Sequence, residues 1–158
     1  MIPNLGEGPR SDSRSRAEEL KEARGKILIV EDNAADVFLI RRAIKSAGVE
    51  EELQVVSDGE HAVEFFDQVD SSDEAPLPRV VVLDINLPKK QGSEVLQHIR
   101  KSRRSAVVPV IAVSTSDSAR DREAMAQFGA NGYFRKPSDY EEFMKLGPII
   151  RAILGDQS

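Results

Sequence analysis

Short apolar runs alternate with longer stretches of mixed polarity along most of the chain. Each run is too short for a helix and is apolar on both faces, which is typical of a strand in a parallel sheet. We therefore predict five strands, over Ile27–Val30, Leu53–Val56, Val80–Leu83, Pro109–Val113 and Asn131–Phe134.

The stretches between these runs carry apolar residues at helical spacing. Further along, Pro148 lacks a backbone donor, so Gly147–Pro148 should kink or interrupt the helix that contains it. The predicted helices run from Asn33 to Ala47, onward from the turn Ser57–Gly59, from Ser93 to Lys101, from Ser116 to Phe128, and from Ser138 or Asp139 to Leu154.

Strands and helices that alternate in this way predict an α/β fold. We expect a doubly wound, five-stranded parallel sheet with helices on both faces and right-handed crossovers. The periodicity alone leaves the order of the strands open. Ligands of such sheets bind at the carboxyl ends of the strands, so functional residues should lie there.

The composition narrows the class of protein. A chain of 158 residues suffices for one domain and a tail. Residues 1–24 are rich in Gly, Pro, Ser and charge, which predicts a mobile leader, or alternatively a docking segment, before a domain over residues 25–158. The net charge of −5 argues against broad binding to nucleic acid or anionic membranes, and the lack of Cys excludes disulfides and thiolate zinc sites. With no membrane-length apolar run and no signal-peptide core, we expect a soluble, cytoplasmic protein.

Polar residues that could bind a ligand or take part in a reaction follow four of the predicted strands. Glu31 and Asp32 follow the first, Asp84 the third, Ser114 the fourth, and Lys136 comes shortly after the fifth. If the first and third strands are neighbours, three carboxylates share one crevice, where they need a cation or raised pKa values. Carboxylate oxygens favour Mg²⁺. A divalent cation, a lysine and a hydroxyl together suit a phosphoryl group, which leaves one carboxylate to act as nucleophile.

Each of these residues also has an ordinary structural explanation. Asp32 or Asn33 could cap the first helix, and Asp84 could be a turn residue. Ser114 could be a polar residue at a strand end, as could Thr115, and Lys136 could be a solvated charge. Four such coincidences at the carboxyl ends of one sheet are less plausible than one shared site.

Four motifs now point to a known family. ILIVEDN at Ile27–Asn33, LDINLP at Leu83–Pro88, VSTS at Val113–Ser116 and GYFRKP at Gly132–Pro137 resemble the signature of two-component response regulator receiver domains. Their order and spacing fit across residues 26–154. The resemblance implies a flavodoxin-like fold with strand order 2-1-3-4-5, switched by Mg²⁺-dependent phosphorylation.

The resemblance also implies a role for each matching residue. Such a domain catalyses only its own phosphorylation and dephosphorylation, so we do not expect an enzyme in the ordinary sense. Glu31 stands where many receivers have Asp, a change that keeps the charge and should preserve metal binding. The implied roles are phosphoacceptor for Asp84; metal ligands for Glu31, Asp32, Asp84 and the Asn86 carbonyl; switch residues for Ser114 and Tyr133; phosphate-binding cation for Lys136; and a cis peptide bond before Pro137.

Within the family, Asn86–Gly92 and Ser138–Phe143 resemble single-domain regulators that pair with phytochrome-type sensor kinases. This finer resemblance implies a histidine kinase of that type as partner. No output domain follows Leu154, so we expect a stand-alone regulator that acts through a downstream protein or a phosphorelay partner. A homodimer is one of the states that the resemblance allows.

Two other functions compete with this interpretation. An aspartate-nucleophile phosphatase needs a second acid two residues after the nucleophile, where this chain has Asn86, an amide that cannot transfer protons. A receiver-like docking module that never carries phosphate would have lost an acid, the acceptor or the lysine, and none is lost. His61 and His98 are expected to face solvent, and the basic run Arg100–Arg104 is expected to serve a helix end, without nucleic-acid binding.

Overall fold

The computed structural model describes residues 25–155. The leader predicted over residues 1–24 lies outside the described residues, as do residues 156–158. No helix in the described range is both long enough and apolar enough to cross a membrane.

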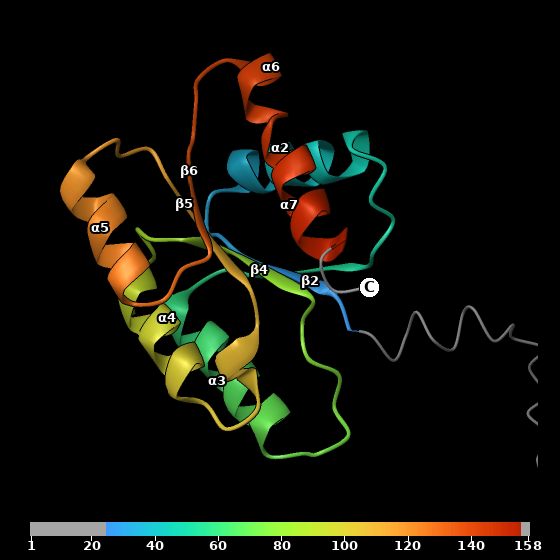
Figure 1. Ribbon diagram of the computed structural model, residues 1–158, viewed down its shortest axis with the longest axis vertical. Coiled ribbons are helices and arrows are strands. Elements are labelled where there is room, and N and C mark those ends of the chain that lie inside the picture. The colour runs from blue at the N-terminus through green and yellow to red at the C-terminus, as the bar shows by residue number, and fades with distance from the viewer. Residues whose placement is uncertain (1–24, 156–158) are drawn as a thin grey trace, which may run out of the picture.

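A five-stranded, wholly parallel sheet forms the centre of the fold (Figure 1). The strands stand in the order β3-β2-β4-β5-β6, which is 2-1-3-4-5 in order along the chain and confirms the predicted fold. In the register, Val30 lies beside Leu83, so the ends of β2 and β4 are level. The strands are β2 (Ile27–Val30), β3 (Leu53–Val56), β4 (Val80–Asp84), β5 (Val110–Ser114) and β6 (Gly132–Arg135).

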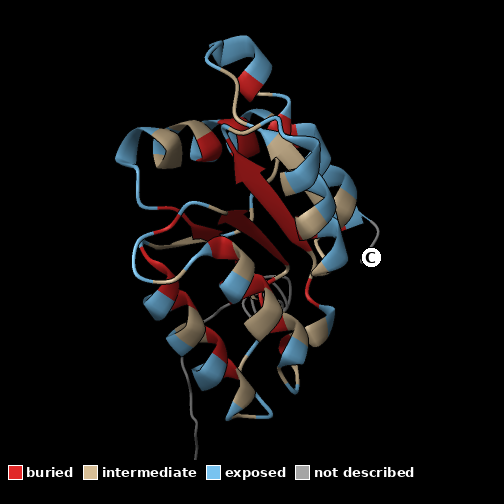
Figure 2. Cartoon of the chain, turned by 90° about the vertical axis from the view of Figure 1, so that its left-hand side faces the viewer, coloured by how far each residue is buried: buried red, intermediate tan, exposed pale blue. Residues whose placement is uncertain are grey.

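Helices cover both faces of the sheet, with buried inner sides and exposed outer sides (Figures 1 and 2). A short 3-10 turn, η1 (Ser105–Val107), precedes β5. One face carries α2 (Ala34–Ser46), α6 (Tyr140–Phe143) and α7 (Leu146–Gly155); the other carries α3 (Gly59–Asp70), α4 (Gly92–Lys101) and α5 (Ala119–Gln127).

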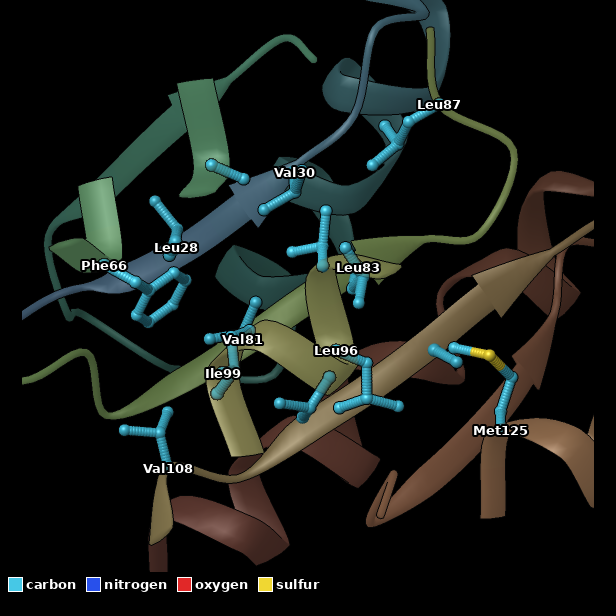
Figure 3. Close-up of a cluster of buried hydrophobic side chains, with 14 residues drawn as sticks. Leu28, Val30, Phe66, Val81, Leu83, Leu87, Leu96, Ile99, Val108 and Met125 are labelled. Carbon is cyan, nitrogen blue, oxygen red and sulfur yellow. The ribbon is translucent and has the colours of Figure 1, made fainter. Parts of the chain in front are cut away.

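Successive strand residues point to opposite faces, so the alternation along each strand divides the core in two. Figure 3 shows the cluster beneath α3, α4 and α5, where Leu28 and Val30 of β2 and Val81 and Leu83 of β4 meet Phe66. The cluster on the other face joins the alternate residues of the same strands to α2, α6 and α7. Because both faces are covered, each central strand is apolar up to its carboxyl end, where β4 ends in Asp84 and β5 in Ser114.

The last helix is interrupted, as predicted, but at a different place. The break falls between Phe143 and Leu146, so Pro148 lies in the first turn of α7, where a missing N–H costs nothing. Gly147 lies against α2, and a Cβ atom there would be 2.1 Å from the carbonyl oxygen of Ala43. The close packing of two helices therefore determines where the chain must contain glycine.

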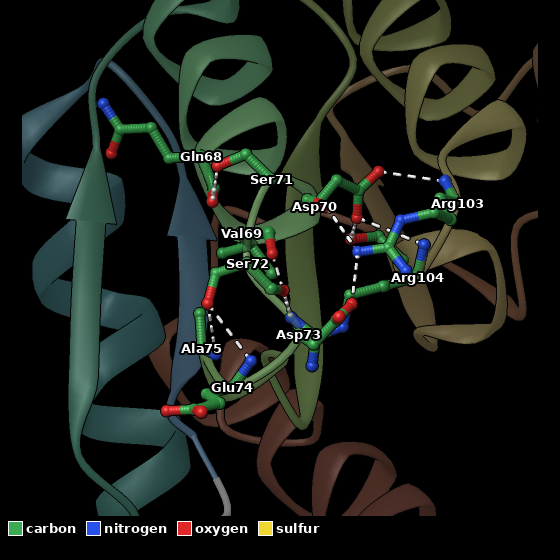
Figure 4. A network of polar contacts seen from close by, with 11 residues as sticks. Gln68, Val69, Asp70, Ser71, Ser72, Asp73, Glu74, Ala75, Arg103 and Arg104 are labelled. Atoms are coloured by element: carbon green, nitrogen blue, oxygen red, sulfur yellow. Dashed lines mark hydrogen bonds and ion pairs between the residues drawn. The ribbon is translucent and has the colours of Figure 1, made fainter.

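Asp70, at the end of α3, organises the segment between α4 and β5 (Figure 4). Its carboxylate accepts hydrogen bonds from the backbone N–H groups of Arg103 (3.0 Å) and Arg104 (3.2 Å) and from the hydroxyl of Ser105 (3.0 Å). Burial opposes ionisation of Asp70, but the bonds from Ser105 and Arg104 outweigh it and hold the pKa of this carboxyl below its ordinary value. The basic run at the end of α4 thus serves the fold.

We expect Asp70→Ala to lower the free energy of unfolding by about 1–3 kcal/mol, because the fully buried Ser105 hydroxyl loses its acceptor. The lowered pKa means that this stabilisation is complete above the unfolded pKa of about 3.9 and is lost as the pH falls through the folded-state value. Urea denaturation at several pH values tests both points. Asp73→Ala, in the exposed loop that follows, should have little effect. Equal stability of the two variants at neutral pH would contradict this account.

Candidate functional site

Three carboxylates meet at the carboxyl edge of the sheet. Glu31 and Asp32 follow β2, Asp84 ends β4, and one oxygen atom from each lies within 4.8 Å of the others. Glu31 and Asp84 are buried, whereas Asp32 is exposed. The site lies at the point where the chain changes direction across the sheet, since β3 is added on one side of β2 and β4 on the other.

Local hydrogen bonds fix the two buried carboxylates. The backbone N–H of Asn33 donates to Glu31 Oε2 (3.2 Å), and the N–H of Asn86 donates to Asp84 Oδ1 (3.0 Å). Asn33 is also the residue that caps α2, because its side chain accepts from the N–H of Asp36 (3.0 Å). Of the two predicted capping residues, Asn33 takes this role and Asp32 belongs to the acidic cluster.

Lys136 is held inside the acidic cluster. Its Nζ lies 2.7 Å from Glu31 Oε1, 2.8 Å from Asp36 Oδ2 and 3.4 Å from Asp84 Oδ2, and its side chain is only 7% exposed. Its backbone N–H donates to the carbonyl oxygen of Ser114 (2.7 Å), which fixes the start of the loop after β6. Lys136 is thus a buried cation with acids on several sides.

The charges of this cluster are strongly coupled. Burial raises the pKa of the Glu31 carboxyl to about 7, and Asp84 acts in the same direction while the Lys136 ammonium opposes it. Burial disfavours the charged form of Lys136, but hydrogen bonds to Asp36 and Glu31 outweigh this and raise its pKa. One lysine therefore does not neutralise the crowded acids. A divalent cation among these oxygens would relieve their repulsion, so the donor set fits Mg²⁺.

Asp36 is part of this site, and the sequence reasoning missed it. It lies in the first turn of α2, and its carboxylate contacts Lys136 from a side chain that is 24% exposed. Side chains in a first helical turn point back toward the helix N-terminus. Since α2 begins beside the end of β2, an acid at this position could have been expected to face the crevice.

The two predicted switch residues meet at Ser116. The Oγ of Ser114, fully buried, accepts a hydrogen bond from the N–H of Ser116 (3.0 Å), and the hydroxyl of Tyr133 donates to the carbonyl oxygen of Ser116 (3.0 Å). The Arg122 guanidinium lies 4.5 Å from the centre of the half-buried Tyr133 ring and pairs with Asp117. The neighbouring Thr115 is exposed. One backbone unit therefore contacts both switch residues.

The prediction of a cis peptide bond before Pro137 is wrong for this structure. The described residues contain no cis peptide bond, so the bond between Lys136 and Pro137 is trans. The trans form is the intrinsically preferred isomer by about 0.5–1 kcal/mol. With this geometry Lys136 still reaches the carboxylates of Glu31 and Asp84.

The histidines and the basic run lie outside the site. His61 has a 59% exposed side chain and contacts Asp58 (2.7 Å), and the partly exposed His98 contacts Asp67 (2.8 Å). Arg100 donates to the backbone carbonyl oxygens of Gly129, Ala106 and Val108. These contacts give each residue a structural role.

Comparison with known proteins identifies the family of this chain. Residues 27–146 match the response regulator receiver domain family. Response regulator Rcp1 of Synechocystis is 33% identical over 120 residues, which cover 76% of this chain and 82% of Rcp1.

Solved structures agree with this match. The phosphorylated cyanobacterial phytochrome response regulator RcpA superposes with a TM-score of 0.74 at 32% identity, covering 86% of this chain and 97% of RcpA. The Mn²⁺-bound form of Rcp1 gives 0.71 at 32% identity, covering 81% and 92%. A receiver domain of a Pseudomonas aeruginosa sensor histidine kinase, with Mg²⁺ in its active-site cleft, gives 0.64 at 28% identity, covering 84% and 99%. This chain belongs to the response regulator receiver family.

Proposed function

We propose that the protein is a stand-alone response regulator receiver, located in the cytoplasm, that accepts a phosphoryl group on Asp84 from a sensor histidine kinase. The observation that carries this proposal is the buried Asp84 carboxylate, which lies beside two further acids and 3.4 Å from the Lys136 ammonium. A nucleophilic carboxylate with a neighbouring cation suits attack on phosphorus.

In the proposed reaction, a carboxylate oxygen of Asp84 attacks the phosphorus atom of a phosphohistidine. The P–N bond breaks, its electron pair returns to the imidazole nitrogen, and an acyl phosphate forms on Asp84. The ammonium of Lys136, 3.4 Å from Asp84, and the hydroxyl of Ser114 would bind the phosphoryl oxygens. Glu31, Asp32, Asp84 and the Asn86 carbonyl would hold Mg²⁺, which supplies charge neutralisation to the transferred group.

The comparisons support a particular kind of partner. RcpA is a phytochrome response regulator, so we propose a phytochrome-type histidine kinase as the phosphodonor. Downstream, the phosphorylated form would act by contact with a protein or by passing phosphate to a relay partner. A phosphatase activity has less support, since Asn86 cannot serve as the acid and base that turnover requires.

The switch would act through Ser116. A phosphoryl oxygen would accept a hydrogen bond from the Ser114 hydroxyl. Movement of that hydroxyl toward the phosphate would alter the bond that Ser114 Oγ accepts from the N–H of Ser116. The carbonyl of the same residue holds the Tyr133 hydroxyl, so the aromatic ring on β6 responds to the change. Both states should be populated beforehand, and phosphate shifts their balance.

The first test concerns the acceptor. Asp84→Asn should abolish the mass increase seen after incubation with a small phosphodonor and Mg²⁺, because the amide is not a nucleophile. Asp139→Asn is the matched control, since it removes a carboxylate at an exposed position outside the cluster and should leave the modification in place. A modification that survives in Asp84→Asn, or that forms equally well with a metal chelator, would disprove the assignment.

The second test concerns the metal. Asp32→Asn removes one of three crowded carboxylates, so the thermal midpoint of the metal-free protein should hold or rise. Mg²⁺, which raises the midpoint of the wild type by binding the folded state, should lose most of this effect. Asp139→Asn removes the same charge at an exposed position outside the cluster and should respond to Mg²⁺ like the wild type. A full response to Mg²⁺ in Asp32→Asn would remove this residue from the metal site.

The third test concerns the switch. Ser114→Ala and Tyr133→Phe should both keep phosphorylation, because Asp84 and the acids remain, but should weaken the response of a partner. A coupling of about 1–3 kcal/mol corresponds to a change in partner affinity of about 5–150-fold in the wild type. Amide shift changes on phosphorylation should extend from Ser114 to Tyr133. Thr115→Ala, an exposed neighbouring hydroxyl, is the control. Shift changes confined to the acidic cluster would disprove this mechanism.

A further inference from the structure

The turn that begins α3 is packed against the loop that follows Asp84. Gly59, the first residue of α3, donates its N–H to the carbonyl oxygen of Pro88 (3.3 Å), which also accepts from the N–H of Lys90 (2.8 Å). A Cβ atom on Gly59 would lie 2.1 Å from the carbonyl oxygen of Lys90 and 2.6 Å from its Cβ. The backbone at Gly59 is therefore packed directly against the backbone at Lys90, and only glycine fits in this space.

The residue before Gly59 reinforces this contact. Asp58 is only 6% exposed and caps α3, with Oδ1 accepting from the N–H of His61 (2.8 Å). Its other oxygen, Oδ2, lies 2.7 Å from His61 Nδ1 and 3.9 Å from Lys89 Nζ. Lys89 has a φ of 71°, a left-handed conformation that residues with side chains rarely adopt. The loop is thus held in an unusual shape next to an anchored carboxylate.

A second glycine, Gly92, holds together the two ends of the loop that runs from Asp84 to Gly92. Gly92 donates its N–H to the carbonyl oxygen of Ile85 (3.1 Å), and a Cβ atom there would lie 2.5 Å from the carbonyl oxygen of Asp84. The loop therefore has little freedom at its ends, and Gly59 fixes its middle. Asn86 lies between these two constraints, two residues before Pro88.

We propose that Asp58 and Gly59 form a positioning element for the metal site, which holds the loop so that the Asn86 carbonyl faces the acidic cluster. This inference rests on the proposed function, because it assigns to the turn a role in the binding of Mg²⁺. Neither residue would contact the ion. A group that orients a ligand in this way typically contributes about 10–100-fold to metal affinity.

Gly59→Ala tests the proposal, because the added methyl must displace the loop at Lys90. Direct titration with Mg²⁺ should show affinity lower by about 10-fold or more. The Mg²⁺ concentration for half-maximal phosphorylation by a small phosphodonor should rise in parallel, while the rate at saturating Mg²⁺ stays close to that of the wild type. Gly155→Ala is the control, since a methyl at that position meets no atom within 4 Å.

A measurement on the wild type covers the case in which Gly59→Ala does not fold. If the turn stabilises the metal-binding shape of the loop, then Mg²⁺ must stabilise the turn by the same amount. Saturating Mg²⁺ should therefore slow hydrogen exchange at the amides of Gly59 and Lys90, and leave the amide of Ser71, at the other end of α3, unchanged.

The outcomes separate this inference from the proposed function. If the wild type binds Mg²⁺ and takes phosphate, but neither Gly59→Ala nor exchange at the Gly59 amide shows the effect, the positioning role is wrong and the proposed function stands. If the wild type binds no Mg²⁺, both are wrong. Weaker binding in Gly59→Ala, together with slower exchange in the wild type, supports the inference.

Discussion

Repulsion among the carboxylates of Glu31, Asp32 and Asp84 is the constraint around which the rest of the site is arranged. Glu31 and Asp84 are buried, and burial raises the pKa of the Glu31 carboxyl. The Lys136 ammonium lowers the pKa of Glu31, but burial and the neighbouring Asp84 together outweigh it and leave that pKa raised. A site in this condition gains stability from a cation, which would also offset the negative charge that a phosphoryl group brings.

The sheet supplies the rigidity that such crowding demands. β2 and β4 are neighbours with level ends, and both are covered on each face by apolar clusters. The acids therefore cannot move apart without disrupting buried strands, which are close-packed. Hydrophobic packing within the sheet thus opposes the electrostatic repulsion at its edge. Ser114 on β5 and Tyr133 on β6 belong to the same sheet, next to this edge.

The sequence was sufficient to predict the strands, because each is short and apolar on both faces, and the resemblance added their order. It also identified Glu31, Asp32, Asp84 and Lys136 as neighbours, since carboxyl ends of parallel strands share one edge. Asp36 and Arg122 were missed because their partners depend on how each helix is rotated on the sheet. The position of the break before Leu146 likewise depends on the contact between α2 and α7. These features arise from tertiary packing, which no local pattern records.

Ser114 and Tyr133 both form hydrogen bonds with the main chain of Ser116, the first with its N–H and the second with its carbonyl oxygen. The side-chain hydroxyl of Ser116 donates a separate hydrogen bond to the carboxylate of Asp121. Every amino acid except proline carries both main-chain groups. A different side chain at this position would therefore leave both main-chain hydrogen bonds available, whereas proline would remove the one that the N–H donates.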